Sequence, residues 1–188
     1  MTDPPFPLSG TTLVTGPSNV GKTRLTARAI EAWVDRHGVD GVVVLDFGPE
    51  LEHEGRVLGG RLSRFGALPD GVWQGVLEAH APRAEGGTVE ESVRLAEDNG
   101  VRARRLLEGA PADPRAVFVN DATIPFQHER GAVRLLTDYC DRAEAAVLNA
   151  FESDELGTDD PVSVRERAAL AALRERADRV VRLDDGDG

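Results

Sequence analysis

Lys22 is the only lysine in the chain, and every other basic residue is an arginine. It stands in the segment GPSNVGKT, residues 16–23, which has the spacing G-x-x-x-x-G-K-T. The glycines of such a loop let backbone N–H groups close around phosphate oxygens. The lysine ammonium is a compact charge that reaches the β- and γ-phosphates, and the threonine hydroxyl is offered to Mg²⁺. The segment therefore predicts the binding of a nucleoside triphosphate together with Mg²⁺.

The sequence on either side of the loop supports this prediction. A β-prone run, Thr11–Thr15, precedes the loop, and apolar residues with helical spacing follow it from Leu25 to Val34. The order strand, glycine loop, helix distinguishes a phosphate-binding loop from a chance match, because the helix directs its N-terminus at the anion. The residues that we expect to contact the nucleotide are Gly16, Pro17, Ser18, Asn19, Val20, Gly21, Lys22, Thr23 and Arg24.

A second apolar run, Ala116–Asn120, is followed by Asp121. A buried strand with a carboxylate at its tip is the Walker-B form, so Thr23 and Asp121 are the expected Mg²⁺ ligands. Asn120 stands where an apolar residue is usual. An alternative register puts Asn120 nearest the metal and makes Asp121 the acid that orients the attacking water. Asp121 as a simple cap of the next turn is a further interpretation.

The acid that orients the attacking water has several candidates after the second predicted strand. The segment VVVLDFGPE, residues 42–50, ends in two acids, and we assign the role to Glu50. An ordinary acidic surface loop explains this segment equally well. Asn149 ends another apolar run and is expected to contact the γ-phosphate or the water, although a turn-forming asparagine is equally compatible. The expected catalytic residues are thus Glu50, Lys22 and Asn149. Alternatives to Glu50 are Asp46, Glu52 and Glu54.

Short continuous apolar runs alternate with helical patterns along the chain. Such runs are typical of parallel strands that are buried on both faces, so the sequence predicts an α/β fold with a mainly parallel sheet. The predicted strands are Thr11–Thr15, Gly41–Asp46, Ala116–Asn120, Ala145–Asn149 and Arg179–Leu183, with a shorter one near Gly75–His80.

Helices are expected between these strands, over Val89–Gly109 and Glu129–Tyr139, and from a capping box at Ser163-x-x-Glu166. No period is evident over Leu51–Gly71. The inward face predicted for the last helix consists of Val164, Ala168, Leu170, Leu173 and Ala177.

Length and composition limit the function classes. The chain suits a single domain over residues 1–188, with a core over 8–185 and flexible ends at 1–7 and 184–188. Its net charge of −11 argues against general nucleic-acid binding, which needs a basic face. Acidic excess with almost no lysine is similar to halophilic archaeal proteins, although a high-GC genome also replaces lysine with arginine.

Neither a signal peptide nor a membrane span is evident in the sequence, so a cytoplasmic protein without membrane contact is expected. Cys140, the single cysteine, has no partner for an internal disulfide and no metal-ligand spacing around it. We expect it to be a buried structural thiol.

Taken together, these segments resemble the RecA/Rad51/KaiC branch of P-loop ATPases. Four stretches carry most of the resemblance, and a fifth, residues 177–183, looks like a late KaiC-type strand. The four are Gly10–Lys22, the strand and P-loop; Leu45–Glu50, the segment of the catalytic glutamate; Val119–Thr123, the Walker B; and Val147–Asn149, the γ-phosphate-sensing strand. The resemblance implies a three-layer RecA-like P-loop NTPase fold, ATP and Mg²⁺ as cofactors, and ATP hydrolysis in a regulatory or assembly role. The family's long DNA-binding loops are not evident, so DNA strand exchange is not expected, while a homo-oligomer or protein partner stays open.

Two other functions remain open at this point. A small-molecule or nucleotide kinase would hold its acceptor in residues 51–82, where Arg56, Arg61 and Arg64 lie. A switch would bind the nucleotide and hydrolyse little of it. A Ras-type GTPase is disfavoured, because Lys22 is the only lysine and no Asn-Lys-x-Asp motif can exist. The cluster Arg102, Arg104 and Arg105 is a solvated helix face or, in an oligomer, a source of a trans-acting arginine finger.

Overall fold

The computed structural model describes residues 3–53, 55–58 and 60–184. Within this part, the centre of the molecule is a six-stranded sheet with the order β5-β2-β6-β7-β1-β8, in which all neighbours are parallel. A separate antiparallel hairpin consists of β3 (Leu51–His53) and β4 (Arg56–Leu58). The strands of the sheet are β1 (Gly10–Gly16), β2 (Val42–Asp46), β5 (Trp73–Val76), β6 (Ala116–Asn120), β7 (Ala145–Phe151) and β8 (Arg179–Arg182).

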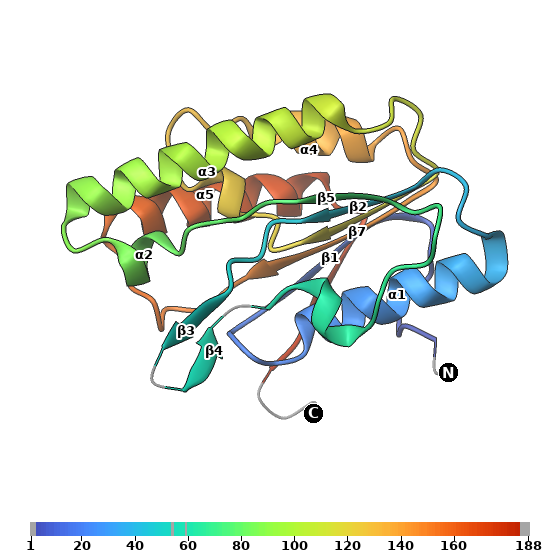
Figure 1. Cartoon of the computed structure of the whole chain (residues 1–188), viewed down its shortest axis with the longest axis horizontal. Coiled ribbons are helices and arrows are strands. Elements are labelled where there is room, and N and C mark those ends of the chain that lie inside the picture. Colours follow the sequence, from blue (N-terminus) through green and yellow to red (C-terminus); the bar gives the residue numbers. More distant parts are fainter. Residues whose placement is uncertain (1–2, 54, 59, 185–188) are drawn as a thin grey trace.

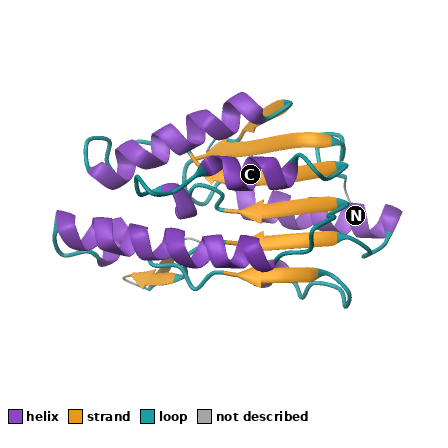
Figure 2. Cartoon of the chain, turned by 90° about the horizontal axis from the view of Figure 1, so that it is seen from above, coloured by secondary structure: helices purple, strands orange, loops and turns teal. Residues whose placement is uncertain are grey.

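Helices cover both faces of the sheet. One face carries α1, and the other carries α3, α4 and α5 (Figure 1). Viewed from above, the strands of the sheet lie side by side beneath the helices (Figure 2). The molecule is therefore a three-layer α/β structure of the RecA-like P-loop type, as the sequence predicts. The helices are α1 (Lys22–His37), α2 (Pro82–Glu85), α3 (Val89–Gly109), α4 (Val133–Cys140) and α5 (Pro161–Arg176), with 3-10 turns η1 (Leu62–Phe65) and η2 (Ile124–Phe126).

The apolar strands feed two cores. Along β2, Val42 and Val44 belong to the core on the α1 side, whereas Val43 and Leu45 belong to the core under α3, α4 and α5. Both faces are buried, which explains why the strand sequences are continuously apolar rather than alternating. Strands packed on both sides hold the residues at their carboxyl ends in fixed positions, and the register places Asp46 opposite Asn120.

The strand order decides which residues meet at the carboxyl edge. β7 lies between β1, which leads into the phosphate loop, and β6, which leads to Asp121. The carboxyl ends of these strands point toward the end of the molecule that also carries the β3–β4 hairpin and α2 (Figure 1). Parallel sheets bind ligands at this edge.

Several element boundaries differ from the prediction. The residue ranges predicted for β6 and α3 are confirmed. α4 begins at Val133, four residues later than expected, because residues 128–132 follow the η2 turn in loop conformation. The short strand is predicted near Gly75–His80, whereas β5 covers Trp73–Val76 and so ends close to the predicted start. The segment without a period, residues 51–71, contains β3, β4 and η1.

The last helix begins earlier than predicted. Asp160 caps α5 by accepting a hydrogen bond from the Ser163 N–H at 2.9 Å, and Pro161 follows in the first turn. The predicted capping box at Ser163 is therefore wrong, because an aspartate followed by proline is the stronger start signal.

The inward face predicted for α5 is also wrong in part. Val164 and Ala168 are exposed, whereas Glu166 is buried. Alanines occur on several faces of this helix, so its apolar stripe is a weak guide to orientation.

Three smaller findings concern the ends and the cysteine. Phe6 is buried in the core beside α1, and Asp3 pairs with Arg36 at 2.6 Å, so residues 3–7 contact the fold. Cys140 is buried as predicted, and burial raises the pKa of its thiol to about 12. Among the helices of the described residues, none combines the length and apolar character needed to cross a membrane.

Candidate functional site

The loop between β1 and α1 adopts the backbone that the motif requires. Asn19 and Gly21 have positive φ angles of 63° and 97°, which asparagine and glycine tolerate best. Gly21 is the N-cap of α1 and forms no side-chain cap. The first N–H groups of α1 are therefore left without a capping side chain, which is the arrangement that binds an anion.

Lys22 is folded back onto this loop. Its Nζ donates a hydrogen bond to the Pro17 carbonyl, and its side chain is buried. Burial lowers the pKa of Lys22, while the charges of Asp121 and Glu155 act in the opposite direction. A buried ammonium at the start of the loop is positioned to form a charge-assisted hydrogen bond with a phosphate oxygen.

A chain of buried amides connects the loop to the sheet. The Thr23 Oγ1 donates to Asn120 Oδ1 at 3.1 Å, and Asn149 Nδ2 donates to the same oxygen at 2.9 Å. The Asn120 Nδ2 donates to Asp46 Oδ1 and to the Gly60 carbonyl, both at 2.8 Å. Asn120, rather than Asp121, is thus the strand-tip residue that contacts Thr23. This geometry favours the alternative register for the Walker-B segment.

Asp121 lies one residue further on, in the left-handed region with φ 55°. Its N–H donates to Asn149 Oδ1 at 2.9 Å, which fixes the turn that directs the side chain into the pocket. Burial raises the pKa of Asp121 to about 7, with Lys22 lowering it and Asp46 and Glu166 raising it. A carboxyl with this pKa can accept a proton near neutral pH.

Gly48 allows the β2 loop to approach this carboxyl. A Cβ at position 48 would lie 2.8 Å from Asn120 Nδ2 and 3.0 Å from Asp121 Oδ2. Any other residue would displace one of these two groups. The position therefore calls for glycine although it carries no chemistry.

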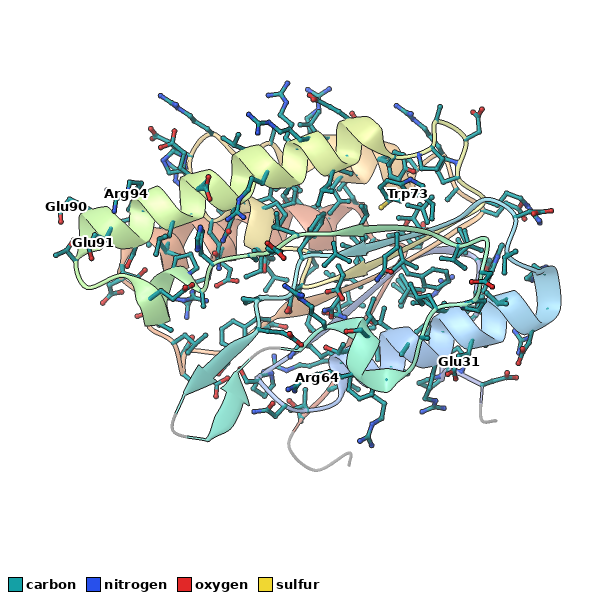
Figure 3. All side chains as sticks on the ribbon, in the orientation of Figure 1. Glu31, Arg64, Trp73, Glu90, Glu91 and Arg94 are labelled. Carbon is teal, nitrogen blue, oxygen red and sulfur yellow. The ribbon has the colours of Figure 1, made fainter. Side chains whose placement is uncertain are left out.

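Two of the predicted catalytic residues lie away from the pocket wall. Asn149 is fully buried, and its Nδ2 also donates to Thr26 Oγ1 at 2.8 Å, so all its hydrogen bonds are internal. Glu50 is exposed, with Oε1 3.5 Å from Arg64 Nε. Figure 3 labels Arg64 on η1, beside the beginning of α1. The direct contact of Asn149 with the γ-phosphate and the role of Glu50 stay predictions.

The other acids and arginines are placed as follows. Glu54 lies outside the described residues, as do the side chains of Glu52 and Arg56. Asp46 is buried behind Asn120 and accepts from the Leu62 N–H at 2.8 Å; burial raises its pKa. Arg102 and Arg104 form ion pairs along α3, with Asp98 at 2.7 Å and Glu108 at 3.1 Å, as expected of a solvated face.

A pocket of about 640 Å³ joins the loop to the opposite wall. The loop side consists of residues 18–24, and Asp121 lies in the lining. The opposite wall contains residues that the sequence analysis did not select. They are Arg83, Thr123, Gln127, Phe151 and Glu166, and Glu155, on the loop side, is a further lining residue of this kind.

Glu166 organises that wall. It is 4% exposed, and its Oε1 accepts from Thr123 Oγ1 at 2.9 Å and from Gln127 Nε2 at 3.1 Å. Its Oε2 pairs with Arg83 at 2.6 Å. The sequence signal that could have found Glu166 is its spacing of four and seven residues from Leu170 and Leu173, which puts an acid on the inward face of α5.

Glu155 occupies the edge of the phosphate loop. Its Oε1 accepts a hydrogen bond from the Ser18 N–H at 2.9 Å, and its charge acts on Lys22. A carboxylate in this position uses the same donors as a phosphate oxygen. Any anion that binds the loop fully must therefore displace it.

We expect Glu155→Gln to bind MgATP more tightly than the wild type, by about threefold to tenfold, because one competing charge is removed from a charge-assisted contact. The dissociation constants can be measured by calorimetry. The matched control is Asp159→Asn, which removes the same charge from the same loop at a residue whose Oδ1 contacts Thr158 instead of the phosphate loop. Equal affinities for Glu155→Gln and the wild type would contradict the prediction.

Comparisons with known proteins add a similarity of fold. No protein-family model matches the chain, and no curated protein matches it either. Among solved structures, the crystal structure of Pif1 helicase from Candida albicans is similar, with a TM-score of 0.40 and 13% sequence identity. The alignment covers 93% of this chain and 36% of the helicase chain, so this chain spans little more than a third of that protein.

Proposed function

We propose that the protein is a Mg²⁺-dependent ATPase of the RecA/KaiC-like type with a role in regulation or assembly. The observation that carries this proposal is the hydrogen bond between Thr23 and Asn120, residues 97 positions apart. It joins the phosphate loop to the tip of the strand that bears the acid. The strand order, with β7 between β1 and β6, supports a RecA-like ATPase.

The loop residues would bind the phosphates through the free N–H groups of α1 and the Lys22 ammonium. The oxygen donors Thr23 and Asn120 fit Mg²⁺, directly or through water. Among the described residues, no cluster of three or more His, Cys, Asp or Glu side chains is present that would hold a metal by itself. Mg²⁺ would therefore enter with the nucleotide, and when bound it neutralises charge on the phosphates.

Asp121 is the acid that we assign to the attacking water. It lines the pocket, and burial raises its pKa to about 7, whereas Glu50 lies outside the lining and pairs with Arg64. Asn149 and Asn120 act as positioning residues, because they hold the Asp121 backbone and the Thr23 hydroxyl. Catalysis would come mostly from positioning and from charge stabilisation.

ATP is the proposed nucleotide because the guanine-reading Asn-Lys-x-Asp motif cannot occur in this chain. The decisive experiment measures MgATP binding and phosphate release by the wild type in molar KCl, over a range of protein concentrations. Binding with turnover supports the proposal, and a specific activity that rises with concentration supports a homo-oligomer. Failure of the folded protein to bind MgATP would overturn the proposal.

A further inference from the structure

The pocket has a second end that the proposed nucleotide contacts leave unused. This Gln127 end, as we call it, consists of Arg83, Thr123, Gln127, Phe151 and Glu166. Its residues come from four separate parts of the chain, so the fold has to bring them together. Gln127 and Glu166 are 2% and 4% exposed, respectively.

The orientation of the Gln127 amide is determined by its neighbour. A carboxylate can only accept hydrogen bonds, so the group facing Glu166 must be the Nε2 amine, at 3.1 Å. The Oε1 oxygen therefore points away from Glu166. It is buried and has no hydrogen-bond partner among the described residues. An unpaired buried carbonyl costs about 1–3 kcal/mol, which a bound group with an O–H or N–H donor would recover.

The charge of this end excludes a second phosphate. The Glu166 carboxylate is already matched by Arg83 at 2.6 Å, and the Arg83 guanidinium also donates to Ser163 Oγ at 3.0 Å and lies over the Phe151 ring at 5.8 Å. Asp121 adds a further carboxyl to the pocket. An anion would be repelled by these carboxylates, and the described cation at this end, Arg83, is already paired, so the donor that binds Gln127 does not belong to an anion.

The position of this end relative to the phosphates follows from two observations. The Thr23–Asn120 hydrogen bond puts the metal-side contacts of the loop at the tip of β6, and the β- and γ-phosphates would share that side. Asp121, the next residue, interacts electrostatically with both Lys22 and Glu166. Lys22, Asp121 and Gln127 line the same cavity, so a group bound to the Gln127 oxygen shares that cavity with the phosphate loop.

We propose that Gln127 is a further catalytic residue, whose Oε1 accepts a hydrogen bond from the O–H group that attacks the γ-phosphate. This inference depends on the ATPase function proposed above. The nucleophile oxygen forms a bond to the γ-phosphorus, and the bond from that phosphorus to the β,γ-bridging oxygen breaks, leaving its electron pair on ADP. The proton of the O–H group leaves the nucleophile as that bond forms and is released to solvent with the products. Gln127 orients the nucleophile and exchanges no proton.

Two sources can supply such an O–H group: water, and the hydroxyl of a small uncharged alcohol. Turnover in ¹⁸O-labelled water with glycerol as the probe alcohol separates them. Water as nucleophile places one ¹⁸O in the released phosphate. An alcohol yields glycerol phosphate without the label, in which case the same site acts as a kinase site.

The test of the residue itself is Gln127→Met, a substitution that keeps the volume of the side chain and removes the amide. We expect the kcat for MgATP to fall about 10-fold to 100-fold while its Kd stays unchanged, because only the positioning of the nucleophile is lost. Gln127→Asn keeps the amide but shortens the side chain by one methylene, so we expect a smaller loss of kcat. It replaces Gln127→Met if that variant does not fold.

The control is Ser163→Ala, which removes a hydrogen bond from Arg83 outside the pocket lining and should leave kcat unchanged. A purely structural role of Gln127 predicts weaker MgATP binding and a lower melting temperature, with kcat per folded site unchanged. That result overturns the inference about Gln127 and leaves the ATPase proposal standing. The same holds if Gln127→Met keeps the kcat of a wild type that is active. A wild type that neither releases phosphate nor forms glycerol phosphate contradicts the ATPase proposal and the inference with it.

Discussion

Lys22→Ala is expected to lose MgATP binding by at least about 100-fold, since two charge-assisted contacts to the β- and γ-phosphates together contribute about 3 kcal/mol. Turnover should become undetectable. The side chain starts α1 and its ammonium already lies within the loop, on the Pro17 carbonyl, so it needs little rearrangement to reach a phosphate. Calorimetric titration with MgATP measures the loss directly.

The composition of the chain makes this residue unusually easy to follow. Because Lys22 is the only lysine, amine-selective acetylation can modify this side chain and the N-terminus and no other amine. Burial lowers its pKa, which increases the reactive neutral fraction. We expect MgATP to protect Lys22 from acetylation, as read by mass spectrometry of the intact and digested protein. The control Arg36→Ala removes a cation from the last turn of the same helix and should bind MgATP normally. Normal binding by Lys22→Ala would refute the assignment.

Local patterns in the sequence were sufficient for most strands of the sheet and for the loop. The range of β6 follows from five buried residues in a row, and the positions of Lys22 and Thr23 follow from the motif spacing alone. These features depend on residues that are neighbours in the chain, so their physical cause lies within a short window. The strand order, which brings Asn120 to Thr23, is a property of the whole sheet and enters only with the structure.

The opposite wall of the pocket could not be predicted for the same reason. Glu166 is interpreted from the sequence as part of a capping box at the helix start, whereas α5 begins at Pro161 and Glu166 lies within the helix, bonded to Thr123 and Gln127. Glu166 precedes Leu170 by four residues and Leu173 by seven, so the period of 3.6 residues puts it on the same buried face of the helix as these leucines. The choice between Glu50 and Asp121 as the acid that orients the attacking water likewise depended on knowing the pocket. Both residues follow an apolar strand, and of the two Asp121 lines the cavity.

Asp121→Asn is the second change with a large expected effect. Loss of a general base costs about 10²-fold to 10⁴-fold in rate, so kcat should fall by that factor while MgATP still binds. Asparagine tolerates the positive φ of this position and has nearly the same shape, so the fold should persist. Phosphate release and calorimetric binding, measured together, separate the two effects. If Asp121 were mainly a metal ligand, MgATP binding would fall along with kcat.

The pH dependence of the wild type provides an independent check on Asp121. The raised pKa of about 7 means that the free protein holds a proton on this carboxyl below neutral pH, so kcat/KM for MgATP should rise with pH up to about 7 and then level off. Asp121→Asn should lack this limb. The control is Asp113→Asn, at an exposed residue shortly before β6 begins. This variant should retain the rise of kcat/KM with pH.

Stability should change with pH in the opposite direction. The folded pKa of about 7 exceeds the usual value of 3.8, so the folded state binds this proton more tightly than the unfolded chain. The resulting contribution to the free energy of unfolding is fully present below the usual value and is lost as the pH rises through about 7. Denaturant titrations should show this decline in the wild type and a smaller one in Asp121→Asn. Burial of Asp121 thus disfavours the ionised form of its carboxyl in the folded state. We expect the same carboxyl to act in catalysis once it ionises, over the pH range in which this contribution to stability is lost.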